Sequence, residues 1–225
     1  VQLLDSTGNV LKTVTTDDSG LYQFTDLIPC VAYRVKVTLP NGYTFTSKTG
    51  NLNDSNNSDV DPVTGVTDEV ILCPGETNNN VDAGGYRPVR IGNFVWRDLN
   101  ANGVYDDGAP ESVGVANVTV RLYSAATDTL LATTSTDANG VYLFQNLQPG
   151  NYYVIFDLST LPAGLMPTTA NVAGDDSLDS DANETTGRTA NTSLIASGGE
   201  DLTVDMGLKA APTATPTNTD KGLQL

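Results

Sequence analysis

Apolar and polar residues alternate along much of the chain. In residues 118–122, 152–156 and 204–208 every second residue is a large apolar one, and the residues between are mostly polar. Side chains with a period of two point to opposite faces of a half-buried strand. Gly, Asn, Asp and Pro interrupt the chain at short intervals, and no segment carries an apolar stripe with a period of 3.6 residues. The pattern predicts an all-β sandwich.

The chain contains an internal repeat. Residues 16–24 (Thr-Asp-Asp-Ser-Gly-Leu-Tyr-Gln-Phe) return as residues 136–144 (Thr-Asp-Ala-Asn-Gly-Val-Tyr-Leu-Phe), and residues 81–84 return as 204–207. Repeats of this length indicate tandem modules. Residues 89–119 have no counterpart before Val1, so the first module is expected to be truncated, without its first strand and the loop after that strand. The expected organisation is a module at 1–88, a complete module at 89–210, and a Pro/Thr-rich linker or tail at 211–225.

Acidic residues outnumber basic ones. Eleven Lys and Arg against 27 Asp and Glu give a net charge of −16. This charge repels nucleic acids and anionic membranes, so neither is an expected partner. No run of 18 apolar residues is present that could enter a membrane. Grouped carboxylates would favour hard cations such as Ca²⁺, whereas scattered ones would only keep the surface soluble.

One group of oxygen side chains has the spacing of an EF-hand-like calcium loop. Residues 98–106 (Asp-Leu-Asn-Ala-Asn-Gly-Val-Tyr-Asp) place oxygen side chains at positions 1, 3, 5 and 9 and glycine at position 6. Position 12 is Ala109 instead of Glu. A polar turn that binds nothing is the alternative. The candidate ligands are Asp98, Asn100, Asn102, the Val104 carbonyl, Asp106, and either Glu111 or Asp107.

A second acidic group lies in residues 175–181 and is echoed in the first module by residues 53–61. Carboxylates so close in sequence repel one another unless a cation compensates them. Recurrence at the same place in both modules favours a cation site over a solvated acidic loop. The candidate ligands are Asp175, Asp176, Asp179 and Asp181 in the second module, and Asp54, Asp59 and Asp61 in the first.

The only cysteines, Cys30 and Cys73, lie in the first module, each beside a proline. We expect them to form a disulfide, because the other features of the sequence suit an extracellular protein; two free thiols are the intracellular alternative.

Several of these motifs together carry a resemblance to a known family. The string Ile-Gly-Asn-Phe-Val-Trp at 91–96 precedes the loop at 98–103. The other marks are the two Thr-Asp-x-x-Gly-x-Tyr-x-Phe strings, the Asp-rich loop and the closing Val-Asp-x-Gly. This combination resembles the calcium-binding B-type repeats of serine-aspartate repeat surface adhesins. The resemblance implies a Greek-key sandwich of the collagen-adhesin B-type, prealbumin-like kind, with Ca²⁺ bound to stiffen a rod.

The chain departs from that family in its cysteines and in the displaced Glu111. Some related modules form a Lys–Asn isopeptide bond, but residues 89–208 contain no lysine. The second module therefore cannot form such a bond internally.

The expected function is a calcium-stabilised stalk or spacer in a secreted or cell-surface adhesin, with neighbouring modules of the same polypeptide as its partners. The alternatives are a filament subunit that exchanges strands with other copies, and a module that itself binds a glycan or matrix ligand. An enzyme is not expected, because the chain has no His and no Ser beside a candidate base.

Overall fold

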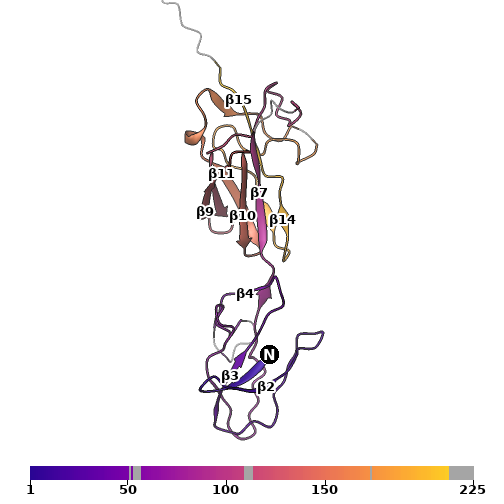
Figure 1. Cartoon of the computed structure of the whole chain (residues 1–225), viewed down its shortest axis with the longest axis vertical. Helices are drawn as coiled ribbons and strands as arrows, with labels where there is room; N and C mark the ends of the chain where they lie inside the picture. The colour runs from indigo at the N-terminus through magenta and orange to yellow at the C-terminus, as the bar shows by residue number, and fades with distance from the viewer. Residues whose placement is uncertain (51, 53–56, 109–113, 173, 213–225) are drawn as a thin grey trace, which may run out of the picture. The chain divides into compact units, whose positions relative to one another are not determined.

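The protein is described by a computed structural model that covers residues 1–50, 52, 57–108, 114–172 and 174–212. The chain divides into two compact units, Val1–Pro88 (unit 1) and Val89–Leu225 (unit 2). Both consist of strands joined by turns, as Figure 1 shows. The single helix among the described residues is the 3-10 turn η1, Leu158–Thr160. No described helix has the length and hydropathy needed to cross a membrane.

Unit 2 is a sandwich of two sheets. One sheet has the order β10-β7-β15-β12, with β14 also paired to β7, and the other has the order β13-β11-β8-β9. The strands of unit 2 are β7 (Val89–Arg97), β8 (Thr119–Ser124), β9 (Thr129–Ser135), β10 (Val141–Leu147), β11 (Gly150–Phe156), β12 (Leu165–Pro167), β13 (Thr192–Leu194), β14 (Glu200–Asp201) and β15 (Met206–Ala210).

The core of unit 2 lies between these sheets. Alternate residues of β8 and β11 face inward, so that Val120, Leu122, Val154 and Phe156 are fully buried. β7 contributes from the opposite sheet and pairs with three strands, antiparallel to β10 and parallel to β14 and β15. Because β7 is central, its residues Val89–Arg97 organise most of their sheet. The predicted all-β sandwich is confirmed.

Unit 1 repeats part of this arrangement. A four-stranded sheet has the order β2-β1-β3-β5, and β4 pairs with β6. The strands are β1 (Gln2–Asp5), β2 (Val10–Thr13), β3 (Ala32–Lys36), β4 (Thr44–Phe45), β5 (Val70–Ile71) and β6 (Gly85–Tyr86). The register Leu3↔Val35 in unit 1 matches Leu122↔Val154 in unit 2. Among its described residues, unit 1 has no counterparts of β7, β10 and β14.

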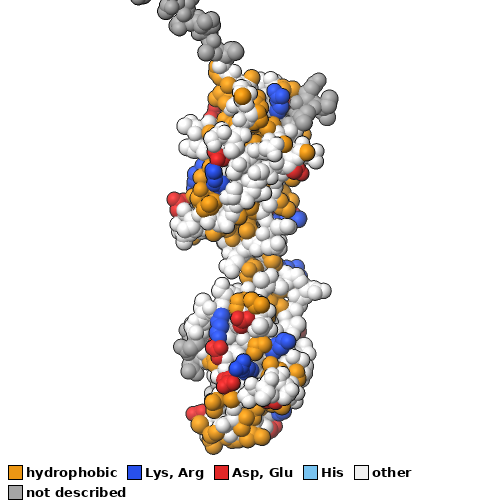
Figure 2. All heavy atoms as spheres, turned by 60° about the vertical axis from the view of Figure 1, so that its left-hand side comes forward, with side chains coloured by type: hydrophobic (Ala, Val, Ile, Leu, Met, Phe, Trp, Pro, Cys, Tyr) orange, Lys and Arg blue, Asp and Glu red, His pale blue; other side chains and the backbone are white. Residues whose placement is uncertain are grey.

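A groove of about 880 Å³ opens in unit 1 beside these strands. Its walls include Leu3, Tyr22, Phe24, Tyr33 and Val35. Tyr142 and Phe144 of unit 2 correspond to Tyr22 and Phe24 in the sequence repeat. Both are buried, and the strand that carries them, β10, pairs with β7. Leu21, which is 69% exposed, and Ile28, which is 67% exposed, also line this groove. Figure 2 shows hydrophobic atoms gathered on one end of this unit.

Candidate metal centre

The first loop leaves the end of β7 and is organised around a buried carboxylate. Asp98 is 2% exposed. Its side chain accepts hydrogen bonds from the backbone N–H of Gly103 at 2.8 Å and of Asn102 at 3.3 Å, and from the Thr168 hydroxyl. Gly103 has φ +85°, and an added Cβ would lie 2.5 Å from the Thr169 carbonyl oxygen. Glycine is therefore required at the sharp turn that the sequence predicted there.

The other predicted ligands of this loop lie close to one another. The Asn100 amide nitrogen donates to Asp106 at 3.1 Å, and the Asn102 amide nitrogen donates to both Asp106 oxygens. Asp107 accepts from the Leu99 N–H at 2.7 Å, which closes the loop. The loop thus brings Asp98, Asn100, Asn102 and Asp106 around one turn, while Glu111 lies outside the described residues.

The second acidic loop lies directly against the first. Val104 and Asp179 form an isolated antiparallel β-bridge, the Tyr105 N–H donates to the Leu178 carbonyl at 2.7 Å, and the Ser180 N–H donates to the Gly103 carbonyl at 3.3 Å. Tyr105 also packs edge-on against Trp96, with ring centroids 5.4 Å apart. The two loops that the sequence predicted as separate cation sites are therefore joined through their backbones.

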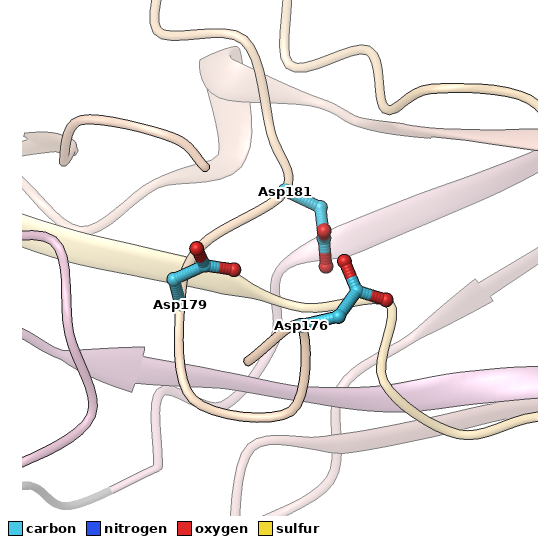
Figure 3. Close-up of side chains that lie close together, drawn as sticks. All are labelled: Asp176, Asp179 and Asp181. Atoms are coloured by element: carbon cyan, nitrogen blue, oxygen red, sulfur yellow. The ribbon is translucent and has the colours of Figure 1, made fainter. Parts of the chain in front are cut away.

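Three carboxylates of the second loop converge. One oxygen from each of Asp176, Asp179 and Asp181 lies within 4.8 Å of the others, and Figure 3 shows the three side chains turned toward one another. Asp179 is 2% exposed. This is the one such group of three metal-ligating side chains found among the described residues. A set of oxygen donors alone suits hard cations such as Ca²⁺ or Mg²⁺.

Burial and mutual repulsion act on the carboxyls of this region. Burial first, and then the charges of Asp176, Asp179 and Asp201, raise the pKa of Asp181 to about 7. Asp205 lies behind the group, where its N–H donates to Asp181 at 2.8 Å. Burial first, and then the charges of Asp181, Asp179 and Asp176, raise the pKa of Asp205 to about 9, although a hydrogen bond from Trp96 acts in the opposite direction. Without a cation, ionisation of these carboxyl groups is therefore energetically unfavourable.

The remaining predicted ligands have other contacts. Asp175 accepts hydrogen bonds from the N–H and the hydroxyl of Ser177, and these bonds lower its pKa. It is not part of the group of three. Asp54 lies outside the described residues. Asp61 accepts hydrogen bonds from the N–H groups of Val63 and Thr64. In unit 2 the equivalent residue, Asn183, forms the same kind of turn with Thr185 and Thr186.

Asp59 is the unit 1 counterpart of Asp181. It is 1% exposed and accepts from the Asp82 N–H at 2.9 Å, as Asp181 does from Asp205. The described part of unit 1 offers no acidic group of three like that of unit 2.

Asp205 is not among the ligands predicted from the sequence. Its side chain accepts from the Trp96 indole N–H at 3.1 Å and from the Asn93 amide at 3.3 Å. The closing Val-Asp-x-Gly, which occurs in both modules, was the available signal, since it places Asp82 and Asp205 at equivalent positions.

The two cysteines are neighbours in unit 1. Their sulfur atoms lie 3.8 Å apart, both side chains are exposed, and both are thiols in this structure. Their predicted bond stays a prediction.

Comparison with known proteins finds one domain family twice in the chain, as the internal repeat predicts. The SdrD B-like domain family matches residues 1–85 and 89–208. Serine-aspartate repeat-containing protein D of Staphylococcus aureus (strain Newman) is 39% identical over 189 residues, which are 83% of this chain and 13% of that protein. Serine-aspartate repeat-containing protein F of Staphylococcus epidermidis (strain ATCC 12228 / FDA PCI 1200) is 32% identical over 213 residues, 94% of this chain and 12% of that protein.

Among solved structures, GBS52, the minor pilin of Streptococcus agalactiae, aligns with 89% of this chain and 68% of its own at a TM-score of 0.37 and 13% identity. The chain spans a small part of the length of the serine-aspartate repeat proteins. Because the family match extends over both units, the chain belongs to the SdrD B-like domain family and consists of B-type repeat modules like those of the serine-aspartate repeat proteins.

Proposed function

We propose that the chain is a spacer of an extracellular, cell-surface adhesin, stiffened by Ca²⁺ and without catalytic activity. Residues 1–88 and 89–210 would be its two modules, 211–225 a linker, and further modules of the same polypeptide its partners. The observation that carries the proposal is the convergence of Asp176, Asp179 and Asp181 within 4.8 Å, at the place where two loops meet.

The electrostatics of unit 2 support a cation at this place. Burial and repulsion raise the pKa of Asp181 to about 7, so the site at neutral pH takes up either a proton or a positive ion. Asp176, Asp179 and Asp181 would hold one Ca²⁺ through carboxylate oxygens. When bound, the ion compensates negative charge that the two loops otherwise bring together.

The first loop would hold a second Ca²⁺ through Asp98, Asn100, Asn102, the Val104 carbonyl and Asp106. Asn100 and Asn102 direct amide nitrogens to Asp106. A half-turn of each amide replaces the nitrogen by an oxygen, which is the donor that Ca²⁺ requires.

The spacer is preferred over a filament built by strand exchange. Donation of β7 to the groove of another copy would remove Ile91, Val95 and Trp96 from the core of unit 2, where each is 0% exposed. The groove would cover the donated strand, but the core that the strand leaves in unit 2 would be opened to water, at a cost of roughly 1.5–3 kcal/mol for each aliphatic side chain exposed.

Calcium titration of the metal-free protein tests the proposal. With a dissociation constant of about 0.1 mM, in the range of extracellular modules, about 1 mM Ca²⁺ stabilises unit 2 by roughly 1.4 kcal/mol per site. We expect heat of binding in calorimetry, a higher melting temperature, and narrower interdomain distance distributions in X-ray scattering. Wild-type protein that shows neither binding heat nor a change in melting temperature would contradict the calcium site.

Two variants locate the ion. Asp179→Asn removes one charge from the group of three and should weaken binding by tenfold or more. Asp175→Asn removes the same charge from the same loop, but its carboxylate caps the Ser177 turn, so Ca²⁺ affinity should change little. Equal effects of the two variants would mean that general acidity, and no defined site, attracts the ion.

A further inference from the structure

The two cysteines of unit 1 face each other across the end of a strand pair. β3 and β5 are antiparallel, with Ala32 opposite Ile71. Beyond this pair the Cys30 N–H donates to the Leu72 carbonyl at 2.7 Å, which extends the ladder to the cysteines. Cys73 is held in a turn, where its N–H donates to Glu76 at 2.7 Å and its carbonyl accepts from the Glu76 N–H at 3.0 Å.

The thiols are close enough to join with little movement of the backbone. Their sulfur atoms are 3.8 Å apart, and a disulfide requires about 2.05 Å. The backbone segments that carry the two cysteines are already held together by a hydrogen bond. Rotation of the cysteine side chains can therefore close the remaining distance between the sulfur atoms. Both side chains are exposed, so a soluble oxidant can reach them.

We propose that Cys30 and Cys73 form a disulfide that staples unit 1. With a small disulfide such as oxidised glutathione, one cysteine thiolate attacks and releases one reduced glutathione. The second thiolate then attacks the mixed disulfide and releases another. Two thiols of the protein lose two electrons and two protons, and one glutathione disulfide becomes two glutathione thiols.

The staple acts where unit 1 lacks strand pairing. Residues 21–29 contain no strand, although in unit 2 the residues equivalent to 21–27 form β10. A hydrogen bond from the Tyr22 hydroxyl to the Val81 carbonyl, 2.6 Å long, holds the beginning of this segment. A Cys30–Cys73 bond would hold its end. In unit 2 these positions are Gly150 and Ile195, and β10 is held by its pairing with β7.

Thiol counting on the full chain tests the proposal. After incubation with oxidised glutathione and denaturation, the wild type should contain no thiol that reacts with a thiol reagent. Its mass should be lower than that of the reduced protein by two hydrogen atoms. Peptide mapping should give one Cys30–Cys73 product. Two free thiols, or one glutathione on each cysteine, would overturn the proposal.

Thermal melting tests the stapling role. The bond would close a separation of 43 residues, so reduction should lower the melting temperature of unit 1 by about 10 °C or more. The double variant Cys30→Ser, Cys73→Ser should melt at the temperature of reduced wild type and should not respond to reductant. An oxidised wild type that melts with the double variant would show that the bond holds nothing in place.

Discussion

The same sequence motif forms a strand in one unit and none in the other. Residues 141–147 form β10 beside β7, whereas residues 21–27, which follow the same Thr-Asp-x-x-Gly turn, form no strand. The local contacts are nevertheless alike. Asp17 accepts from the N–H groups of Ser19 and Leu21, and Asp137 accepts from those of Asn139 and Val141.

The difference between the units lies in the partner strand. β10 is an edge strand that pairs with β7 and with no other strand in the described part of the chain, and the described part of unit 1 has no counterpart of β7. The turn forms from local sequence, and in both units the tyrosine hydroxyl donates to a distant backbone carbonyl, that of Val81 for Tyr22 and that of Val204 for Tyr142. Strand geometry requires a neighbouring strand in addition. Tyr22 and Phe24 are therefore only half-buried, while Tyr142 and Phe144 are 3% and 5% exposed.

The largest expected effect comes from equivalent leucines in the two units. Leu122→Ala and Leu3→Ala remove side chains that are 0% and 2% exposed. We expect losses of about 2–5 kcal/mol, at the upper end for Leu122, which is enclosed by the core, and at the lower end for Leu3, which borders the groove. Hydrogen-exchange mass spectrometry of the whole chain measures each unit separately.

Leu131→Ala, on an exposed side chain of β9, is the control and should change stability by less than about 0.5 kcal/mol. Equal losses for Leu122→Ala and Leu3→Ala would contradict the description of an open groove in unit 1.

The next effect concerns pH. The pKa values of Asp181 and Asp205 are raised to about 7 and about 9, whereas an unfolded carboxyl titrates near 3.8. Between these values the folded state binds more protons than the unfolded state, so stability falls as pH rises. The melting temperature of metal-free unit 2 should therefore decrease from pH 5 to pH 9 in calorimetry.

The variant Asp205→Asn keeps an oxygen for the Trp96 indole and should flatten the upper part of this pH dependence. In unit 2 the pKa values of Asp157 and Asp175 are lowered from 3.8, so these two groups titrate below this window and do not contribute. Metal-free unit 2 that melts at one temperature from pH 5 to pH 9 would contradict the raised pKa values.

The smallest effect concerns the shared turns. Asp137→Ala removes an acceptor from two backbone N–H groups and should cost about 1 kcal/mol. Asp17→Ala removes the same bonds from a turn that leads into no strand, so the cost should be smaller. Asp137→Asn retains an acceptor and serves as the control. Urea unfolding monitored by hydrogen exchange measures the loss of unfolding free energy for each variant. A larger loss for Asp17→Ala than for Asp137→Ala would contradict this prediction.

Sequence alone predicted what depends on local pattern. The alternation in residues 118–122 and 152–156 predicted β8 and β11, and the Asp98 spacing predicted a loop with a required Gly103. Long-range pairing was not predictable in the same way. The bridge between Val104 and Asp179 joins loops that no local pattern connects, and Asp205 meets Trp96 across 109 residues.

The contact between Trp96 and Asp205 has a spectroscopic consequence. Trp96 is the only tryptophan of the chain, it is 0% exposed, and its indole N–H donates to a carboxyl whose pKa is raised to about 9. A charge at this position shifts the energy of the indole excited state, and Tyr105 of the first loop packs edge-on against the same ring. Tryptophan fluorescence, excited at a wavelength that tyrosine does not absorb, thus reports on unit 2 alone, on the ionisation of one buried carboxyl and on the docking of one loop.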